Sequence, residues 1–210
     1  MPHSMRVPRE EFRKLDLVVH GILRGVPLHD VSVIDLPGGG AGRTLSDVRS
    51  LMADANLRAV NPVVRALVAL RVRAGLLFGW DSDIHTIHKH QEASYIHRLS
   101  DDVRQRSALA PGSPDGRLQL LYLLERESLG EFRNATVHAL FAIALTEAPG
   151  GYRLYWAVYV HRVSRFTPLY MALIDPFRRF IVYPAVLRRI RRAWEERYPR
   201  PLDPRESAAV

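Results

Sequence analysis

The sequence predicts one α+β domain in which an antiparallel sheet curls around a long C-terminal helix, with an extra helix at the N-terminus. Residues 117–163 alternate between apolar and polar side chains and are broken by Gly130 and by residues 149–151, as in an antiparallel meander. Residues 167–198 carry apolar side chains at spacings of three and four, which indicates one buried helical stripe. A length of 210 residues suits one domain or at most two small ones.

Composition narrows the class of protein further. A hydrophobic content of 47% can supply a core, and the absence of cysteine excludes disulfides and cysteine-ligated metals. No apolar run approaches the roughly 18 residues that a membrane span needs, and the first nine residues lack a secretory signal. We therefore expect a cytoplasmic protein. The net charge of +8 is concentrated after Arg178, and no recognition motif accompanies it, so no nucleic-acid partner is expected.

Residues 1–30 are predicted to form an N-terminal extension that contains an amphipathic helix over residues 9–24. Glu10 and Glu11 suit the first turn of that helix. Its apolar side chains recur at helical spacing and must dock on another surface: Phe12, Leu15, Val19 and Ile22. Residues 31–198 are predicted to form the main domain, and residues 199–210 a disordered tail.

A short strand over residues 29–36 is predicted to precede two helices, over residues 44–53 and 61–79. Asn61 suits the N-cap of the second helix, and Pro62 its first position. The glycines at 38–40 lack the following Lys-Ser/Thr of a phosphate loop, so no nucleotide site is expected there.

Histidines are densest over residues 81–91, where His85, His88 and His90 accompany two aspartates. Their mixed spacing does not bring ligands together from one helix face or one strand face. We therefore expect no metal or other cofactor. Residues 110–116 lie further along the chain and are predicted to form a loop.

Three strands are predicted to follow, over residues 117–128, 133–146 and 152–163, with turns at Gly130 and at 149–151. Alternation along the second and third strands places Phe141, Ile143 and Trp156 on one apolar face. We expect this face to pack against the last helix.

The last helix is predicted to be bent, because prolines interrupt its apolar stripe. Either it begins at Pro168 and bends at Pro176 and Pro184, or residues 170–174 form a final strand; the continuous stripe favours the helix. The stripe consists of Leu169, Leu173, Phe177, Phe180, Leu187, Ile190 and Trp194. Its burial predicts a cost of about 3–5 kcal/mol for Phe177→Ala or Phe180→Ala.

A basic surface is predicted largely opposite this stripe, formed by Arg188, Arg189, Arg191 and Arg192. Each cation near an anionic bilayer contributes about 1 kcal/mol of attraction. Because the stripe is expected to be occupied by the sheet, any membrane contact should be weak and reversed by salt.

Three segments resemble a known family: residues 62–77 with their centre at 67–71, residues 127–131 as a turn between strands, and residues 169–177. On these segments the chain resembles an uncharacterised bacterial family of unknown function. That family is grouped with START-like and plant-allergen-like ligand-binding proteins of helix-grip fold. The resemblance covers about residues 36–194. The family commonly has His where this chain has Arg178, so no role for that His is carried over.

This resemblance implies that a hydrophobic small molecule, such as a lipid, polyketide or isoprenoid, binds in a cavity between the sheet and the terminal helix. The candidate ligand-binding residues are Arg71, Tyr122, Glu125, Phe141 and Trp156. No nucleophile motif is present, and no catalytic residue is assigned. Two alternatives stay open: cyclase, dehydratase or isomerase chemistry in the same cavity, or a membrane-surface or partner-binding module working through the basic helix. The oligomeric state is left open.

Overall fold

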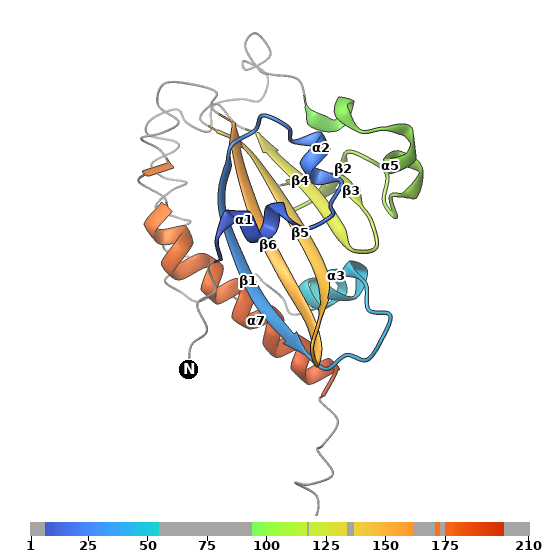
Figure 1. Ribbon diagram of the computed structural model, residues 1–210, viewed down its shortest axis with the longest axis vertical. Coiled ribbons are helices and arrows are strands. Elements are labelled where there is room, and N and C mark those ends of the chain that lie inside the picture. The colour runs from blue at the N-terminus through green and yellow to red at the C-terminus, as the bar shows by residue number, and fades with distance from the viewer. Residues whose placement is uncertain are drawn as a thin grey trace, which may run out of the picture.

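One open antiparallel sheet forms the centre of the protein (Figure 1). The computed structural model describes residues 7–54, 94–116, 118–133, 137–161, 171–172 and 175–199. Within these residues six strands lie in the order β1-β6-β5-β4-β3-β2. Their bounds are β1 Leu28–Pro37, β2 Ser113–Asp115, β3 Leu118–Leu123, β4 Glu127–Arg133, β5 His138–Ala148 and β6 Gly151–His161. The sheet packs against a C-terminal helix, so the predicted α+β class is confirmed.

Helices cover both faces of the sheet (Figure 1). One face packs against α3 (Leu45–Asp54) and α7 (Tyr183–Arg197), and we call it the α7 face. The opposite face lies under α1 (Arg9–Arg13), α2 (Val19–Ile22), η2 (Tyr95–Arg98) and α5 (Asp101–Arg106). The predicted helix over 61–79, the histidines of 81–91 and the tail beyond residue 199 lie outside the described residues.

The apolar face predicted from alternation is the α7 face. Ile143 packs in the same cluster as the buried residues of α7, and Trp156 packs against that cluster and contacts the ring of Tyr183. The other face is buried as well, because Tyr155 and Tyr159 pack in the cluster that covers it. The hydroxyl of Tyr155 reaches the N-terminal segment, where it donates to Glu11 Oε1 at 2.8 Å.

The single N-terminal helix predicted over residues 9–24 is wrong, since the segment forms two short helices, α1 and α2. A side chain of the sheet contacts the backbone between α1 and α2. The carboxylate of Glu127 accepts the backbone N–H groups of Val18 and Val19 at 2.8 and 3.4 Å. Glu127 thus satisfies free N–H groups at the N-terminus of α2 and fixes where this second helix begins.

The predicted turn at Gly130, which the resemblance placed over residues 127–131, is wrong: Gly130 lies in the middle of β4. The chain reverses before it, at residues 124–126, where Leu124 N–H donates to Glu127 O at 2.8 Å. A side chain at Gly130 would place its Cβ 3.3 Å from Leu118 Cδ1, so crowding accounts for the glycine. The region predicted to hold three strands therefore holds four, β3 to β6. The loop predicted over 110–116 contains the short edge strand β2, which makes the meander one of five strands.

The strand predicted over 29–36 and the helix predicted over 44–53 are confirmed as β1 and α3. The glycines between them allow the chain to pass over Trp194. Gly39 has a φ of +90°, and a Cβ there would lie 2.6 Å from Trp194 Cζ2. The indole N–H donates to Pro37 O at 2.9 Å. These glycines thus serve the packing of a helix residue.

The terminal helix contains a π-turn, η3 (Arg178–Val182), directly before α7. Pro184 has no N–H and its ring opposes the carbonyl four residues earlier, which accounts for a wider turn at this point. Met171 and Ala172 are helical, which favours the bent helix over the alternative strand at 170–174.

The π-turn changes which residues face the sheet. A π-turn rotates the chain less per residue than an α-helix does, so side chains before it are displaced around the axis relative to those after it. The buried stripe of Tyr183, Leu187, Ile190 and Trp194 is therefore continued by Asp175 and Arg179, which contact β1. The predicted burial of Phe177 and Phe180 is wrong, because they are 41% and 79% exposed. Leu169 and Leu173 lie outside the described residues.

Phe177→Ala and Phe180→Ala are each expected to change the free energy of unfolding by less than about 0.5 kcal/mol, because neither substitution opens a cavity. Urea unfolding of both variants measures this directly. A loss of the 3–5 kcal/mol typical of a buried phenylalanine would contradict the exposed placement.

Candidate functional site

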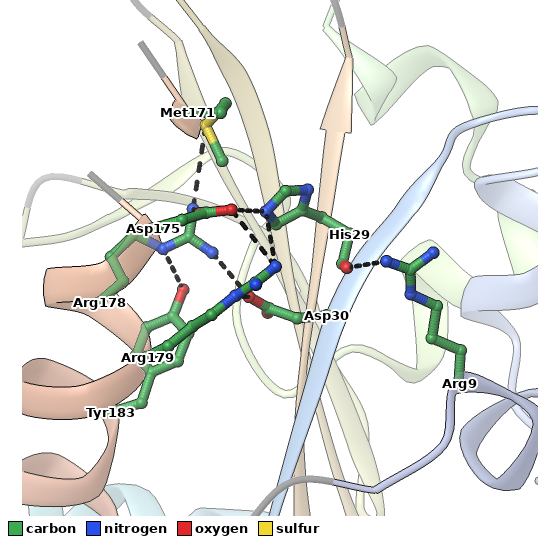
Figure 2. Close-up of polar contacts among 8 residues, drawn as sticks. All are labelled: Arg9, His29, Asp30, Met171, Asp175, Arg178, Arg179 and Tyr183. Atoms are coloured by element: carbon green, nitrogen blue, oxygen red, sulfur yellow. Dashed lines mark hydrogen bonds and ion pairs between the residues drawn. The ribbon is translucent and has the colours of Figure 1, made fainter. Parts of the chain in front are cut away.

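Strand β1 carries a β-bulge at His29, close to the start of the terminal helix. Leu28 pairs with Tyr159 and Asp30 pairs with Val158, so two residues of β1 advance against one of β6. Bulges redirect side chains, and here both His29 and Asp30 point toward the terminal helix (Figure 2). The carbonyl of His29 accepts a hydrogen bond from Arg9 Nη2 of α1 at 2.6 Å.

Two arginines and two aspartates meet at this bulge (Figure 2). Arg178 contacts Asp30 Oδ2 at 3.1 Å and Asp175 Oδ1 at 3.4 Å. Arg179 contacts the same two carboxylates, Asp30 Oδ2 at 3.6 Å and Asp175 Oδ2 at 3.3 Å. His29 Nε2 lies 2.6 Å from Asp175 Oδ2. We call His29, Asp30, Asp175, Arg178, Arg179 and Tyr183 the ion-pair cluster.

Tyr183 connects the ion-pair cluster with the apolar side of the helix. Its hydroxyl oxygen accepts a hydrogen bond from Arg178 Nε at 2.8 Å, and burial raises the pKa of this phenol. The same guanidinium donates a long contact of 3.9 Å to the sulfur of Met171. Tyr183 therefore stays neutral and places a hydroxyl at the boundary between charged and apolar surface.

His29, Asp30 and Asp175 offer ligand atoms within 4.8 Å of one another, as a three-ligand metal site would. Both carboxylates, however, already contact both guanidinium groups. Two positive and two negative charges balance, and a divalent cation would add two uncompensated charges to a partly buried cluster. The three potential ligands are therefore better suited to pairing with Arg178 and Arg179 than to binding a metal ion.

An aromatic surface lies beside the ion-pair cluster on the α7 face. The rings of Phe141 and Trp156 are 6.5 Å apart, and those of Trp156 and Tyr183 are 6.2 Å apart. Phe141 and Trp156 are only partly buried, although they stand on the interior strands β5 and β6 of a covered face. Both side chains therefore keep part of their surface accessible in the middle of this face.

Four buried polar atoms here have no hydrogen-bond partner among the described residues: Asp30 Oδ1, Trp156 Nε1, Asp175 Oδ1 and Arg179 Nε. Asp175 Oδ1 and Arg179 Nε each have an ion-pair partner, at 3.4 and 3.6 Å, so Asp30 Oδ1 and Trp156 Nε1 are the two atoms without either kind of contact. Asp30 is only 3% exposed. In the register of β1 and β6, Asp30 is opposite Val158 and Ser32 is opposite Trp156, so the two side chains are diagonal neighbours. Diagonal cross-strand neighbours lie roughly 7–8 Å apart, within reach of a shared small group. One acceptor and one donor are thus left unpaired beside an aromatic surface.

The structure brings together only two of the predicted ligand-binding residues, Phe141 and Trp156. Tyr122 is buried on the opposite face, where its hydroxyl donates to Glu127 Oε2 at 3.3 Å. Glu125 is exposed in the turn between β3 and β4. Arg71 lies outside the described residues.

Sequence reasoning missed the ion-pair cluster. Asp30 lies in the strand predicted over residues 29–36, and Arg178 and Arg179 lie where the positively charged C-terminal segment begins. His29 and Asp175 are 146 residues apart in the chain. The available signal is the aspartate at 30 in a strand whose residues 31, 33, 34 and 36 are apolar, because a buried carboxylate needs a cationic partner.

Two buried carboxylates on β4, Glu127 and Glu131, fasten the helices of the opposite face. Glu127 binds the N–H groups at the start of α2, and burial raises the pKa of Glu127 despite these hydrogen bonds. Glu131 accepts from Ser94 Oγ at 2.5 Å and Tyr95 N–H at 2.9 Å beside η2, and lies 2.8 Å from His138 Nε2. Burial acts to raise the pKa of Glu131, but the hydrogen bonds from His138, Ser94 and Tyr95 outweigh it and lower the pKa.

The fold and the site together define a class of protein: an α+β domain whose open sheet packs on a terminal helix, with an ion-pair cluster where β1 meets that helix. The chain belongs to the family described as "Protein of unknown function (DUF2867)", whose model matches residues 22–185. The matched region includes every member of the ion-pair cluster.

No curated protein and no solved structure gives a significant match. The START-like relationship stays a prediction, as does the cytoplasmic location. No helix in the described ranges is long and apolar enough to cross a bilayer.

Proposed function

We propose that this protein binds a largely apolar small molecule against the α7 face of the sheet, over Phe141 and Trp156. The observation that carries the proposal is the pair of unpartnered buried atoms, Asp30 Oδ1 and Trp156 Nε1, beside these two partly buried rings. Binding sites for small molecules are mostly apolar and hold a few polar groups that orient the ligand.

The proposed ligand carries one polar group at one end. Trp156 N–H needs an acceptor and Asp30 Oδ1 needs a donor, and a hydroxyl or an amide supplies both. Leaving either atom buried and unpaired costs about 1–3 kcal/mol, so a ligand that satisfies them gains affinity over a purely apolar one. The paired guanidinium groups of Arg178 and Arg179 hold Asp30 in place for this contact.

Two measurements test the proposal. The first is native mass spectrometry of the protein purified from its own cells. The second is displacement of the fluorescent probe 1-anilinonaphthalene-8-sulfonate from the protein. We expect a co-purifying apolar molecule that displaces the probe. Phe141→Ala or Trp156→Ala is expected to weaken probe binding about tenfold or more, since each removes an aromatic contact of about 1.5 kcal/mol.

Two controls separate binding at this face from non-specific adsorption. Leu109→Ala shortens an exposed apolar side chain after α5 and should leave probe affinity unchanged. Trp156→Phe keeps a smaller apolar ring and deletes the indole N–H, so it should weaken hydroxyl-bearing ligands more than their hydrocarbon analogues. Equal affinities for the wild type and both alanine variants would rule out this site.

A further inference from the structure

An uncharged apolar surface covers the outer side of the terminal helix around its π-turn. Phe177 and Phe180 are exposed there, and with Leu109 they are the large exposed apolar side chains of the described residues. Their apolar neighbours in the same segment are exposed or partly exposed: Ala172, Pro176, Ile181, Pro184 and Ala185. We call these residues, with Phe177 and Phe180, the apolar surface.

The two arginines in this segment do not interrupt the apolar surface. Arg178 and Arg179 turn inward and contact Asp30 and Asp175, as Figure 2 shows. The π-turn that aims these guanidinium groups at β1 also turns Phe177 and Phe180 outward. The ion-pair cluster and the exposed rings are thus two consequences of the same local geometry.

Positive charge follows the apolar surface along the helix. Phe180, Pro184, Arg188 and Arg192 succeed one another at four-residue spacing, which places neighbours on one side of a helix. Arg188 and Arg192 are exposed and have no ion-pair partner among the described residues. The helix lies along one side of the molecule (Figure 1). Its outer side therefore presents aromatic rings first and arginines about two to three turns further on.

From this arrangement we infer that the outer side of the terminal helix docks on an anionic lipid bilayer. Aromatic side chains enter the interfacial region of a bilayer, and exposed arginines bind its phosphates. Charge complementarity favours an anionic bilayer, because Arg188 and Arg192 are exposed cations without an ion-pair partner among the described residues. Leu187, Ile190 and Trp194 stay packed on the sheet, so the helix docks without leaving the core.

Co-sedimentation with phosphatidylcholine vesicles, with and without phosphatidylglycerol, tests the inference at low and high salt. The wild type should bind the anionic vesicles, and part of this binding should persist at high salt because the rings insert. The double variant Phe177→Ser/Phe180→Ser should lose the salt-resistant part. The double variant Arg188→Glu/Arg192→Glu should lower the affinity for anionic vesicles about tenfold or more.

Matched controls come from other surfaces of the same chain. Leu109→Ser removes an apolar side chain of 42% exposure after α5, and Arg24→Glu reverses an exposed charge after α2. Both should bind vesicles as the wild type does, and all variants should keep its melting temperature because the replaced side chains are exposed. Absence of vesicle binding, or binding equally sensitive to the controls, would overturn the inference. Sedimentation equilibrium showing a dimer that Phe177→Ser/Phe180→Ser dissociates would assign the surface to a second copy instead.

Discussion

Trp194→Ala is expected to lower the free energy of unfolding by about 3–5 kcal/mol, the range for removing a buried aromatic side chain. Trp194 is fully buried and packs on Tyr152 and Tyr198, with ring centroids 5.7 and 4.8 Å away. The substitution also leaves Pro37 O without its donor. Urea unfolding followed by circular dichroism measures the loss.

Two companion variants make this result specific. Trp194→Phe retains most of the apolar contact and deletes the hydrogen bond, so its cost should be smaller, about 1–3 kcal/mol. Gly39→Ala should also destabilise, because it combines a left-handed φ with a Cβ 2.6 Å from the indole. A cost for Trp194→Ala no larger than that of the exposed Phe180→Ala would show that the helix does not pack here.

Glu131→Ala is the second substitution with a large expected effect, about 3–5 kcal/mol, because it removes one partner of a buried pair. The side chains of Glu131 and His138 are 0% and 2% exposed. Without the carboxylate, His138, Ser94 Oγ and the N–H of Tyr95 lose a common acceptor. We expect η2 and α5 to loosen first, which amide hydrogen exchange of residues 94–106 would detect.

The pH dependence of this stabilisation follows from the lowered pKa of Glu131. A carboxylate with a lowered pKa stabilises the folded state above its unfolded value, here 4.5, and the stabilisation is lost as the pH falls through the folded value. Wild-type stability should therefore fall steeply below about pH 4.5, and Glu131→Gln should flatten this slope.

Glu127 provides the opposite control on the same strand. Its pKa is raised, so its contribution is present below 4.5 and is lost as the pH rises through the folded value. Glu127→Gln should remove a decline in stability above pH 4.5 and leave the acid limb unchanged. Identical profiles below pH 4.5 for the wild type and Glu131→Gln would contradict the assignment of the acid limb to Glu131.

The regular elements near the candidate site were predictable from the sequence. The period of two placed Phe141, Ile143 and Trp156 on the face toward the last helix, and helical spacing placed Leu187, Ile190 and Trp194 on its buried side. The α+β class followed from these two periods. Glycine positions predicted the turns less well. Gly130 is predicted to form a turn, whereas it lies within β4 and leaves room for the side chain of Leu118 on β3.

The candidate site itself depends on two irregularities that periodic patterns do not encode. The bulge at His29 adds one residue to β1 and directs His29 and Asp30 toward the helix. The π-turn before Pro184 brings Arg178 and Arg179 inward and turns Phe177 and Phe180 outward. An offset of one residue reverses the side of a strand or rotates a helix face. The buried stripe that is predicted to continue through the π-turn to Phe177 and Phe180 is therefore wrong.

By itself, the sequence determined the class of fold, the position of the sheet and its covering helix, and the apolar character of the face between them, because these depend on local period. The tertiary structure alone decided which charged residues meet. Asp30 and Arg178 are 148 residues apart, and their pairing exists only because β1 lies beside the terminal helix. A buried charge is tolerated only where an oppositely charged side chain lies within contact distance. The topology of the whole chain determines where that side chain lies.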